Sequence, residues 1–203
     1  MNSRKKQKDK EWQALEQSVC FFHIVIFYGI TLILTLGMML LIFHFSGENA
    51  ELSSDLSGGI CERMIHFLNH NLHLGWDRTQ IVHYSKWIET PIRKCAHFTE
   101  YMLFSICANL HGFSILLLKK DANYFVKNIR EQMVLRKPLL FKCCLFCITY
   151  AAGDEIHQAF VPGRACRFFD VCVDTGGILF GAFLVSLGLR FFSAYRKGKK
   201  EKI

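Results

Sequence analysis

The stretch that decides the fold is Tyr150-Ala151-Ala152-Gly153-Asp154-Glu155-Ile156-His157-Gln158-Ala159-Phe160-Val161-Pro162-Gly163-Arg164. It places two carboxylates, an imidazole and an amide at the end of an apolar run long enough to cross a lipid bilayer. A charged side chain at the centre of a membrane helix costs about 2.5–3.5 kcal/mol on insertion scales. A sequence that retains such a cluster is therefore expected to use it.

Four long apolar runs divide the chain of 203 residues, 51% of which are hydrophobic. The runs cover about residues 19–45, 95–118, 139–160 and 168–192. Each reaches the roughly 20 residues that span about 30 Å of hydrocarbon. With their connections they use nearly the whole length, which leaves no room for a separate soluble domain. The sequence therefore predicts one all-α integral membrane domain over residues 18–193, a bundle of four transmembrane helices.

The formal net charge of +8 is concentrated between and beyond these runs. Lysine and arginine gather at the N-terminus (residues 1–17), in the connection 119–137 and in the tail 194–203. With four spans these three segments lie on one side of the membrane, and the positive-inside rule makes that side the cytoplasm. We therefore expect both termini to be cytoplasmic and the basic residues to attract anionic membrane lipids. We expect no nucleic acid as a partner.

The segment 46–93 is then expected outside the cell. It opens with turn-forming residues at 46–49 and 53–55, and it continues with two weakly amphipathic stretches, Ile60–Leu72 and Thr79–Ile88. Apolar residues recur in both stretches at helical spacing. They predict two short helices that lie on the outer surface of the membrane.

The nine cysteines do not form the pattern of a disulfide framework. Most fall within or at the edges of apolar runs, where cysteine acts as a small hydrophobic residue. Cys143 and Cys147 are spaced as a metal pair would be, but packing is the better explanation within a membrane helix. Cys61, Cys95 and Cys166 are expected outside, and the sequence leaves open whether two of them form a bridge.

The costly polar residues of the last three spans fall in one layer near the predicted outer surface. Spacings of three and four residues place His97 beside Glu100 and Tyr101 on the second span. Asp154, His157 and Gln158 share a face of the third span, with Glu155 about 100° away. The residues of this layer are Lys94, His97, Glu100, Tyr101, Asp154, Glu155, His157, Gln158, Arg164, Asp170 and Asp174. Exposure of these groups to lipid would cost more than about 10 kcal/mol, so we expect them to face one another or a wet cleft.

The fourth span combines two of these acids with a stripe of small residues. Asp170, Asp174, Gly177, Gly181 and Gly188 follow one another at helical spacing. Gly177 and Gly181 form the small-xxx-small pattern that allows close backbone contact between membrane helices. The face that packs inside the bundle is therefore predicted to carry the acids as well.

Three chemical interpretations fit the layer. A divalent metal ion could be held by His97, His157, Asp154, Glu155 or Asp170, although no HExxH-type spacing is present. Alternatively, the candidate catalytic residues Asp154, Glu155, Asp170, Asp174 and His97 could act as acid and base, beside an Arg164 that holds an anionic group. Finally, the residues could satisfy one another in a network that has no external ligand.

The ordered motifs also resemble a known family. Lys94-x2-His97-Phe98-x2-Tyr101 is followed by Asp154-Glu155-x2-Gln158-x-Phe160-x-Pro162-Gly163-Arg164 and then by Asp170-Val171-x2-Asp174-Thr175-x-Gly177-x3-Gly181. This order resembles the VanZ-like membrane proteins over about residues 90–185. The resemblance implies a bacterial cell-membrane protein that acts at the envelope, in a family named for resistance to the glycopeptide teicoplanin. It implies no particular reaction.

Three function hypotheses follow. In the first, a non-enzymatic envelope protein binds a glycopeptide, a lipid-linked precursor or a partner in an outer-leaflet polar cleft. The binding residues would be Lys94, His97, Glu100, Tyr101, His157, Gln158 and Arg164. In the second, a membrane-embedded hydrolase or transferase acts on a lipid-linked envelope substrate. A transporter is the third, but four spans offer little path without oligomerisation.

Overall fold

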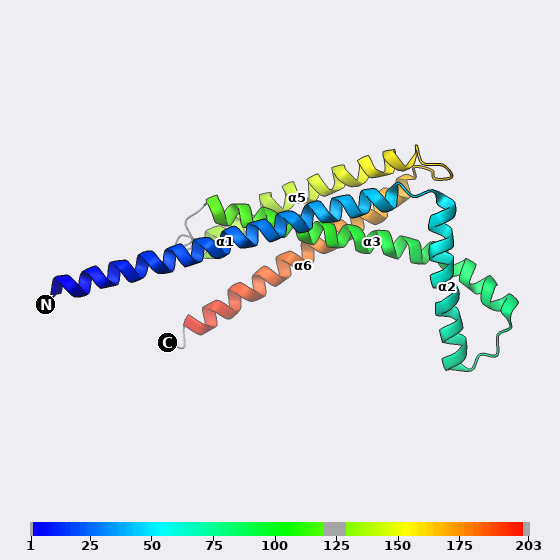
Figure 1. Ribbon diagram of the computed structural model, residues 1–203, viewed down its shortest axis with the longest axis horizontal. Helices are drawn as coiled ribbons and strands as arrows, with labels where there is room; N and C mark the ends of the chain where they lie inside the picture. The colour runs from blue at the N-terminus through cyan, green and yellow to red at the C-terminus, as the bar shows by residue number, and fades with distance from the viewer. Residues whose placement is uncertain (1, 120–128, 201–203) are drawn as a thin grey trace.

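The computed structural model describes residues 2–119 and 129–200, and these residues contain five helices and no strand. The helices are α1 (Asn2–Ser46), α2 (Ala50–Leu72), α3 (Arg78–Lys119), α5 (Ile129–Gln158) and α6 (Phe168–Lys200). Figure 1 shows α1, α3, α5 and α6 running along a common long direction, with α2 standing across it near one end. Both termini lie at the opposite end of the bundle. The all-α prediction is confirmed.

Three helices in the described part of the chain are long and apolar enough to cross a membrane: Phe21–Ser46, Arg78–Leu118 and Phe168–Phe192. The predicted span at 139–160 is helical up to Gln158, as part of α5, but it is not among them. Its apolar stretch carries Lys142 at one end and Asp154 and Glu155 at the other. The four-span bundle is therefore supported for three spans only.

The apolar surfaces face outward, as expected in lipid. Only 11% of the α1 span is buried inside the protein. Ile33 and Leu40 on α1, Phe141 on α5 and Phe191 on α6 are each about two-thirds exposed or more. A helix that is hydrophobic on all sides needs an apolar environment. These three apolar helices fit a membrane protein.

The helices extend further than the sequence predicted. The basic N-terminal segment continues the helix of the first span, and the last span continues to Lys200. The connection predicted at 119–137 is shorter, because α5 already begins at Ile129, and residues 120–128 lie outside the described part. Hydropathy marks where a helix meets lipid, but it does not mark where the helix ends.

The segment 46–93 differs most from its prediction. The first expected helix is present as α2, which starts ten residues earlier than Ile60 and includes the predicted turn at 53–55. The second, Thr79–Ile88, is not a separate helix but the first turns of α3, which continues through Pro91. Asp77 and Gln80 form a reciprocal capping box, with backbone N–H donors 2.8 and 3.0 Å from the partner side-chain oxygens. This box fixes the start of α3.

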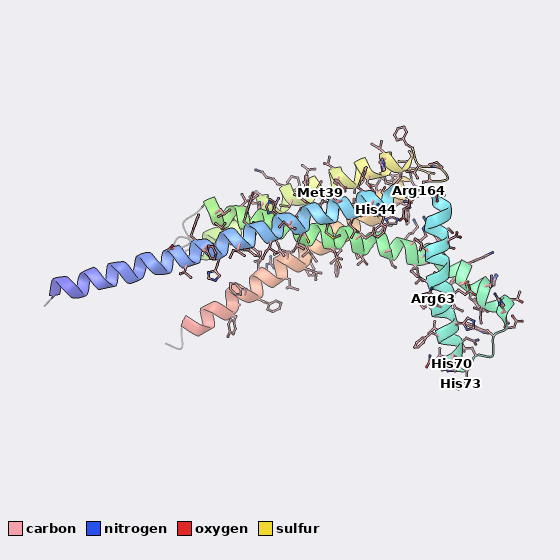
Figure 2. All side chains as sticks on the ribbon, viewed as in Figure 1. Met39, His44, Arg63, His70, His73 and Arg164 are labelled. Atoms are coloured by element: carbon pink, nitrogen blue, oxygen red, sulfur yellow. The ribbon has the colours of Figure 1, made fainter. Side chains whose placement is uncertain are left out.

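Serine hydroxyls attach α2 to α3. Ser54 and Ser57 donate to Glu89 Oε1 at 2.6 and 2.9 Å. Further along α2, Cys61 and Ile65 are buried against α3. The far end of α2 at His70, and His73 just after it, project away from the bundle (Figure 2).

The centre of the bundle is α3, which packs against each of the other described helices. Its closest neighbour is α6, because a Cβ at Gly177 would overlap the carbonyl oxygen of Phe98 and a Cβ at Gly181 that of Met102. The predicted role of these two glycines in close helix contact is confirmed. Gly188 does not share it, since a Cβ there would meet nothing within 4 Å.

Candidate functional site

The predicted polar residues gather at the end of the bundle where α2 branches off, which we call the α2 end. This end also contains the connections 47–49 and 159–167. Five of the predicted side chains are buried there: Tyr101, Asp154, Glu155, Gln158 and Asp174, at 0 to 8% exposure. They come from α3, α5 and α6. Asp174 lies one turn from Gly177, where α6 contacts α3 closely, and it interacts electrostatically with Tyr101.

An ion pair and a histidine–carboxylate contact lie at the edge of this cluster. Lys94 on α3 pairs with Asp170 on α6, and its ammonium group lies 4.5 Å from the centre of the Phe169 ring. His97 Nδ1 lies 3.7 Å from Glu100 Oε2 on the same helix. The side chains of both pairs are partly exposed. The pairs therefore close the rim of the cluster, where water or a ligand can reach them.

Glu155 and Arg164 attach the α5–α6 connection to the helices. Glu155 Oε2 accepts a hydrogen bond from the backbone N–H of Arg167 at 3.0 Å, just before α6 begins. Arg164 Nη2 donates to the carbonyl of Phe45 at 3.0 Å, at the last turn of α1 (Figure 2). A cation is favoured at a helix C-terminus. Gly163, with φ of 77°, makes the turn that lets Arg164 reach back.

The interior of the cluster contains polar atoms that have no hydrogen-bond partner among the described residues. They include Tyr101 Oη, Asp154 Oδ1 and Asp174 Oδ1. These three groups interact electrostatically with one another, and the Tyr101 hydroxyl lies within hydrogen-bond reach of the Asp154 carboxylate, although not in regular hydrogen-bond geometry. The second oxygen of Asp154 accepts a hydrogen bond from Gln158 Nε2 at 3.0 Å. A buried acceptor without a partner costs about 1–3 kcal/mol. Asp174 Oδ1 is therefore a buried acceptor for which the described residues supply no hydrogen-bond donor.

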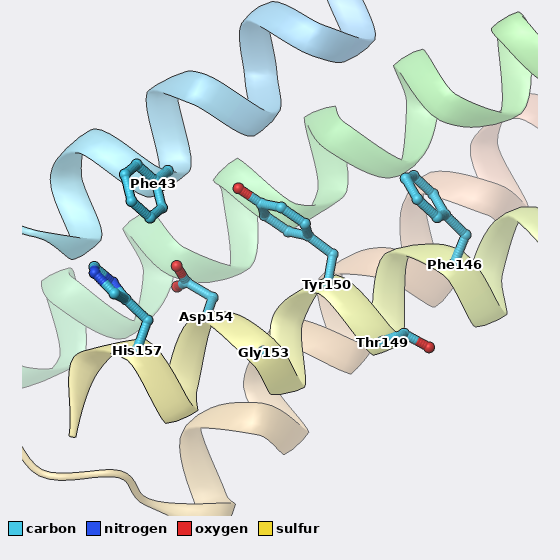
Figure 3. Close-up of a pocket in the computed structure, with 7 residues that line it drawn as sticks. All are labelled: Phe43, Phe146, Thr149, Tyr150, Gly153, Asp154 and His157. Carbon is cyan, nitrogen blue, oxygen red and sulfur yellow. The ribbon is translucent and has the colours of Figure 1, made fainter. Parts of the chain in front are cut away.

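His157 points away from the acids of α6 and toward α1. Its ring stacks on Phe43 with centroids 4.8 Å apart. Both residues line a groove of about 400 Å³ between α1 and α5, the α1–α5 groove (Figure 3). The other lining residues are Phe146, Thr149, Tyr150, Gly153 and Asp154. Asp154 therefore belongs to both the buried cluster and the groove.

The sequence did not identify the apolar side of this groove. Tyr150 precedes Asp154 by one turn, so the spacing could have placed the two on one face. Its hydroxyl donates to the carbonyl of Met39 on α1 at 2.6 Å. Phe43 had no comparable signal, because it is one phenylalanine in an apolar span. Only the packing of α1 on α5 gives it a place in the site.

The described residues contain no group of three or more His, Cys, Asp or Glu side chains close enough to hold a metal ion. The metal candidates are separated: Asp170 pairs with Lys94, Glu155 bonds to a backbone N–H, and His157 faces α1. Cys61, Cys95 and Cys166 are free thiols. Cys147, fully buried beside Phe104 and Ala151, is part of the hydrophobic core, as the packing interpretation predicts.

Fold and site together define an all-helical protein of membrane type, with a polar cluster buried at one end of its bundle. Residues 31–190 match the family model described as VanZ/LLP1. The chain belongs to this VanZ-like family, and the resemblance in its motifs is confirmed. No curated protein and no solved structure matches the chain significantly.

Proposed function

We propose that the protein acts in the bacterial cell membrane as a ligand-binding envelope protein of the VanZ type. The polar cluster at the α2 end would bind part of a lipid-linked envelope precursor, or of a glycopeptide such as teicoplanin, and so lower the access of the antibiotic to its target. The observation that carries this proposal is the burial of Tyr101, Asp154 and Asp174 together, with Asp174 Oδ1 lacking a hydrogen-bond partner among the described residues. A ligand that donated a hydrogen bond to this oxygen would recover the cost of its burial.

The proposal includes a topology. Both termini lie at one end of the bundle, which fits an even number of crossings, with α5 as the fourth span. The basic segments at that end favour the cytoplasm. The α2 end would then face outward, where glycopeptides and lipid-linked precursors meet the membrane. The charges on α5 would be tolerated because Asp154 and Glu155 are buried against other helices rather than exposed to lipid.

Expression in a glycopeptide-susceptible Gram-positive host tests this proposal. We expect the protein to reduce teicoplanin susceptibility, and Asp170→Asn to abolish the effect at unchanged protein level. The replacement keeps the size of the side chain but removes the charge that holds Lys94. Unchanged susceptibility in cells that contain the wild-type protein in their membrane would contradict the proposal.

The second candidate is a membrane-embedded hydrolase or transferase that acts on a lipid-linked substrate. The observation that favours it is the proximity of acids in unlike surroundings: Asp174 and Asp154 are deeply buried, whereas Asp170 is partly exposed and paired. Such differences separate an acid from a base. His97 and His157 would assist, and Arg164 would hold an anionic group.

Conservative replacements distinguish the two candidates. Glu155→Gln keeps a hydrogen-bond acceptor for the Arg167 N–H but removes acid–base function. If protein level and resistance survive Glu155→Gln while Asp170→Asn abolishes resistance, the enzymatic candidate fails and the binding candidate is supported. A divalent metal ion at His97, His157, Asp154, Glu155 or Asp170 would require these side chains to move together. Elemental analysis of the purified protein tests for it, and a stoichiometric absence removes the metal version.

A further inference from the structure

Among the described helices, only α2 does not run along the bundle. Figure 1 shows it standing across the direction of the other helices, at one end. The α1 span ends at Ser46, and α2 begins at Ala50, directly after the short connection 47–49. A helix that starts where a span ends and turns across it follows the surface of the membrane.

The side chains of α2 form three faces. Cys61 and Ile65 are buried on the face that packs against α3. At about 100° per residue, an apolar face lies about 80–160° from it in one direction, and a polar face about 80–120° from it in the other. The apolar face consists of Leu56, Ile60, Met64 and Phe67, and the polar face includes Asp55, Glu62 and His66. Packing against α3 therefore leaves two outer faces of opposite character.

The protein leaves the apolar face largely uncovered. Its four large side chains are between 41% and 66% exposed. In water, such a row would form a contiguous apolar patch, which the surface of a soluble protein rarely carries unless it is an interaction site. An apolar environment would stabilise it by removing this surface from water.

The composition of α2 suits the membrane surface rather than the membrane interior. In the part of the chain that the structure describes, α2 is not among the helices apolar enough to cross a bilayer. A helix with one apolar and one polar face lies in the interface, with its apolar face about 5–10 Å into the boundary between head groups and acyl chains. The neighbouring start of α3 carries aromatic residues of the interfacial type: Trp76 stacks on Tyr84 with ring centroids 4.4 Å apart, and Trp87 is 74% exposed.

We propose that α2 binds the lipid surface, with its apolar face in the upper acyl chains and its polar face in water. Continuity with the lipid-facing surface of α1 identifies lipid as the occupant. Phe43 and Phe45, in the last turn of the α1 span, are 54% and 43% exposed, so the lipid around them extends to α2. The inference goes beyond the proposed function and does not depend on which side of the membrane the α2 end faces.

The proposal differs from the sequence prediction of two surface helices, because it assigns this role to α2 alone. The second predicted helix, Thr79–Ile88, belongs to α3. It is attached to α2 through Glu89, which accepts hydrogen bonds from Ser54 and Ser57. An α2 held in the lipid surface therefore fixes the depth of α3, the helix against which the rest of the bundle packs.

Tryptophan fluorescence of the full-length protein in phosphatidylcholine nanodiscs tests the proposal. The three native tryptophans are replaced by phenylalanine, and a single tryptophan is introduced by Phe67→Trp on the apolar face or by His66→Trp on the polar face. Both positions are exposed, and they are adjacent in the chain, so they form a matched pair. We expect lipid brominated on the upper acyl chain to quench the tryptophan at 67 at least about twofold more than the one at 66.

A second pair, Ile60→Trp and Asp55→Trp, repeats the comparison if a variant of the first pair lowers protein yield. Equal quenching on the two faces would overturn the inference, since α2 would then not present one face to the lipid. Absence of quenching on the apolar face, together with dimers cross-linked through α2, would assign that face to a second copy of the chain instead. The proposed function is measured separately, through the effect of Asp170→Asn on susceptibility, so either proposal can fail alone.

Discussion

The contacts that α3 makes with α6 and those that α1 makes with α5 show how differently two helix pairs can meet in one small bundle. At the first, Gly177 and Gly181 bring the backbone of α6 onto that of α3. At the second, aromatic side chains keep the helices apart and leave a groove of about 400 Å³. Asp174 lies on the closed contact, whereas Asp154 faces both the cluster and the groove. Close packing thus positions the acids, and loose packing gives access to one of them.

The largest effect is expected at the closed contact. Gly177→Ala places a methyl group against the Phe98 carbonyl oxygen, so the helices must separate, at a cost of about 1–3 kcal/mol. Denaturation of the purified protein in detergent measures this loss. Gly188→Ala is the control and should change stability little, because its site is open. Equal stability of the two variants would mean that α6 does not pack against α3 as described.

At the open contact, one hydrogen bond joins the helices. Tyr150→Phe removes the bond from its hydroxyl to the Met39 carbonyl and should destabilise the protein by about 1 kcal/mol. The same denaturation assay applies. Tyr195→Phe, at a position that is 72% exposed, is the control and should have no effect. Identical behaviour of the two variants would contradict the contact between Tyr150 and α1.

The Lys94–Asp170 pair belongs to the closed contact, but it lies at the rim. Because both side chains are partly exposed, the coupling should be small, about 0.2–1 kcal/mol. A double-mutant cycle with Lys94→Met and Asp170→Asn measures it. Additive effects would show that the two charges act independently.

The smallest change in stability is expected inside the cluster. Tyr101→Phe removes a buried hydroxyl whose interaction with the Asp154 carboxylate does not reach regular hydrogen-bond geometry, so stability should change little. Ser105→Ala, one turn further along α3, removes the hydroxyl that donates to the Ile178 carbonyl at 2.7 Å and should cost about 1 kcal/mol. If Tyr101→Phe costs as much as Ser105→Ala, the Tyr101 hydroxyl donates a full hydrogen bond to Asp154.

Much of the candidate site could be predicted, because helical spacing is local information. The contact of Asp154 with Gln158 follows from their spacing on one helix, and the close approach of Gly177 follows from the absence of its side chain. The shared face did not reveal that His157 turns toward α1 and stacks on Phe43. The groove could not be predicted, since it depends on how Phe43 of one helix faces another that is about 110 residues away in the chain. The continuity of α3 through Pro91 was missed for a similar reason: its packing against α1, α2, α5 and α6 maintains a helix that local propensity would interrupt.

By itself, the sequence determined that this chain is helical, that it has apolar segments suited to a membrane, and that its costly polar residues occupy one layer. These properties follow from composition and from the 3.6-residue period, which each segment carries alone. Only the tertiary structure decided that the layer divides between a buried cluster and an open groove, and that Asp154 belongs to both. The reason is physical: the face that a helix turns toward its neighbour is set by side-chain volumes on both helices, and no single segment contains that information.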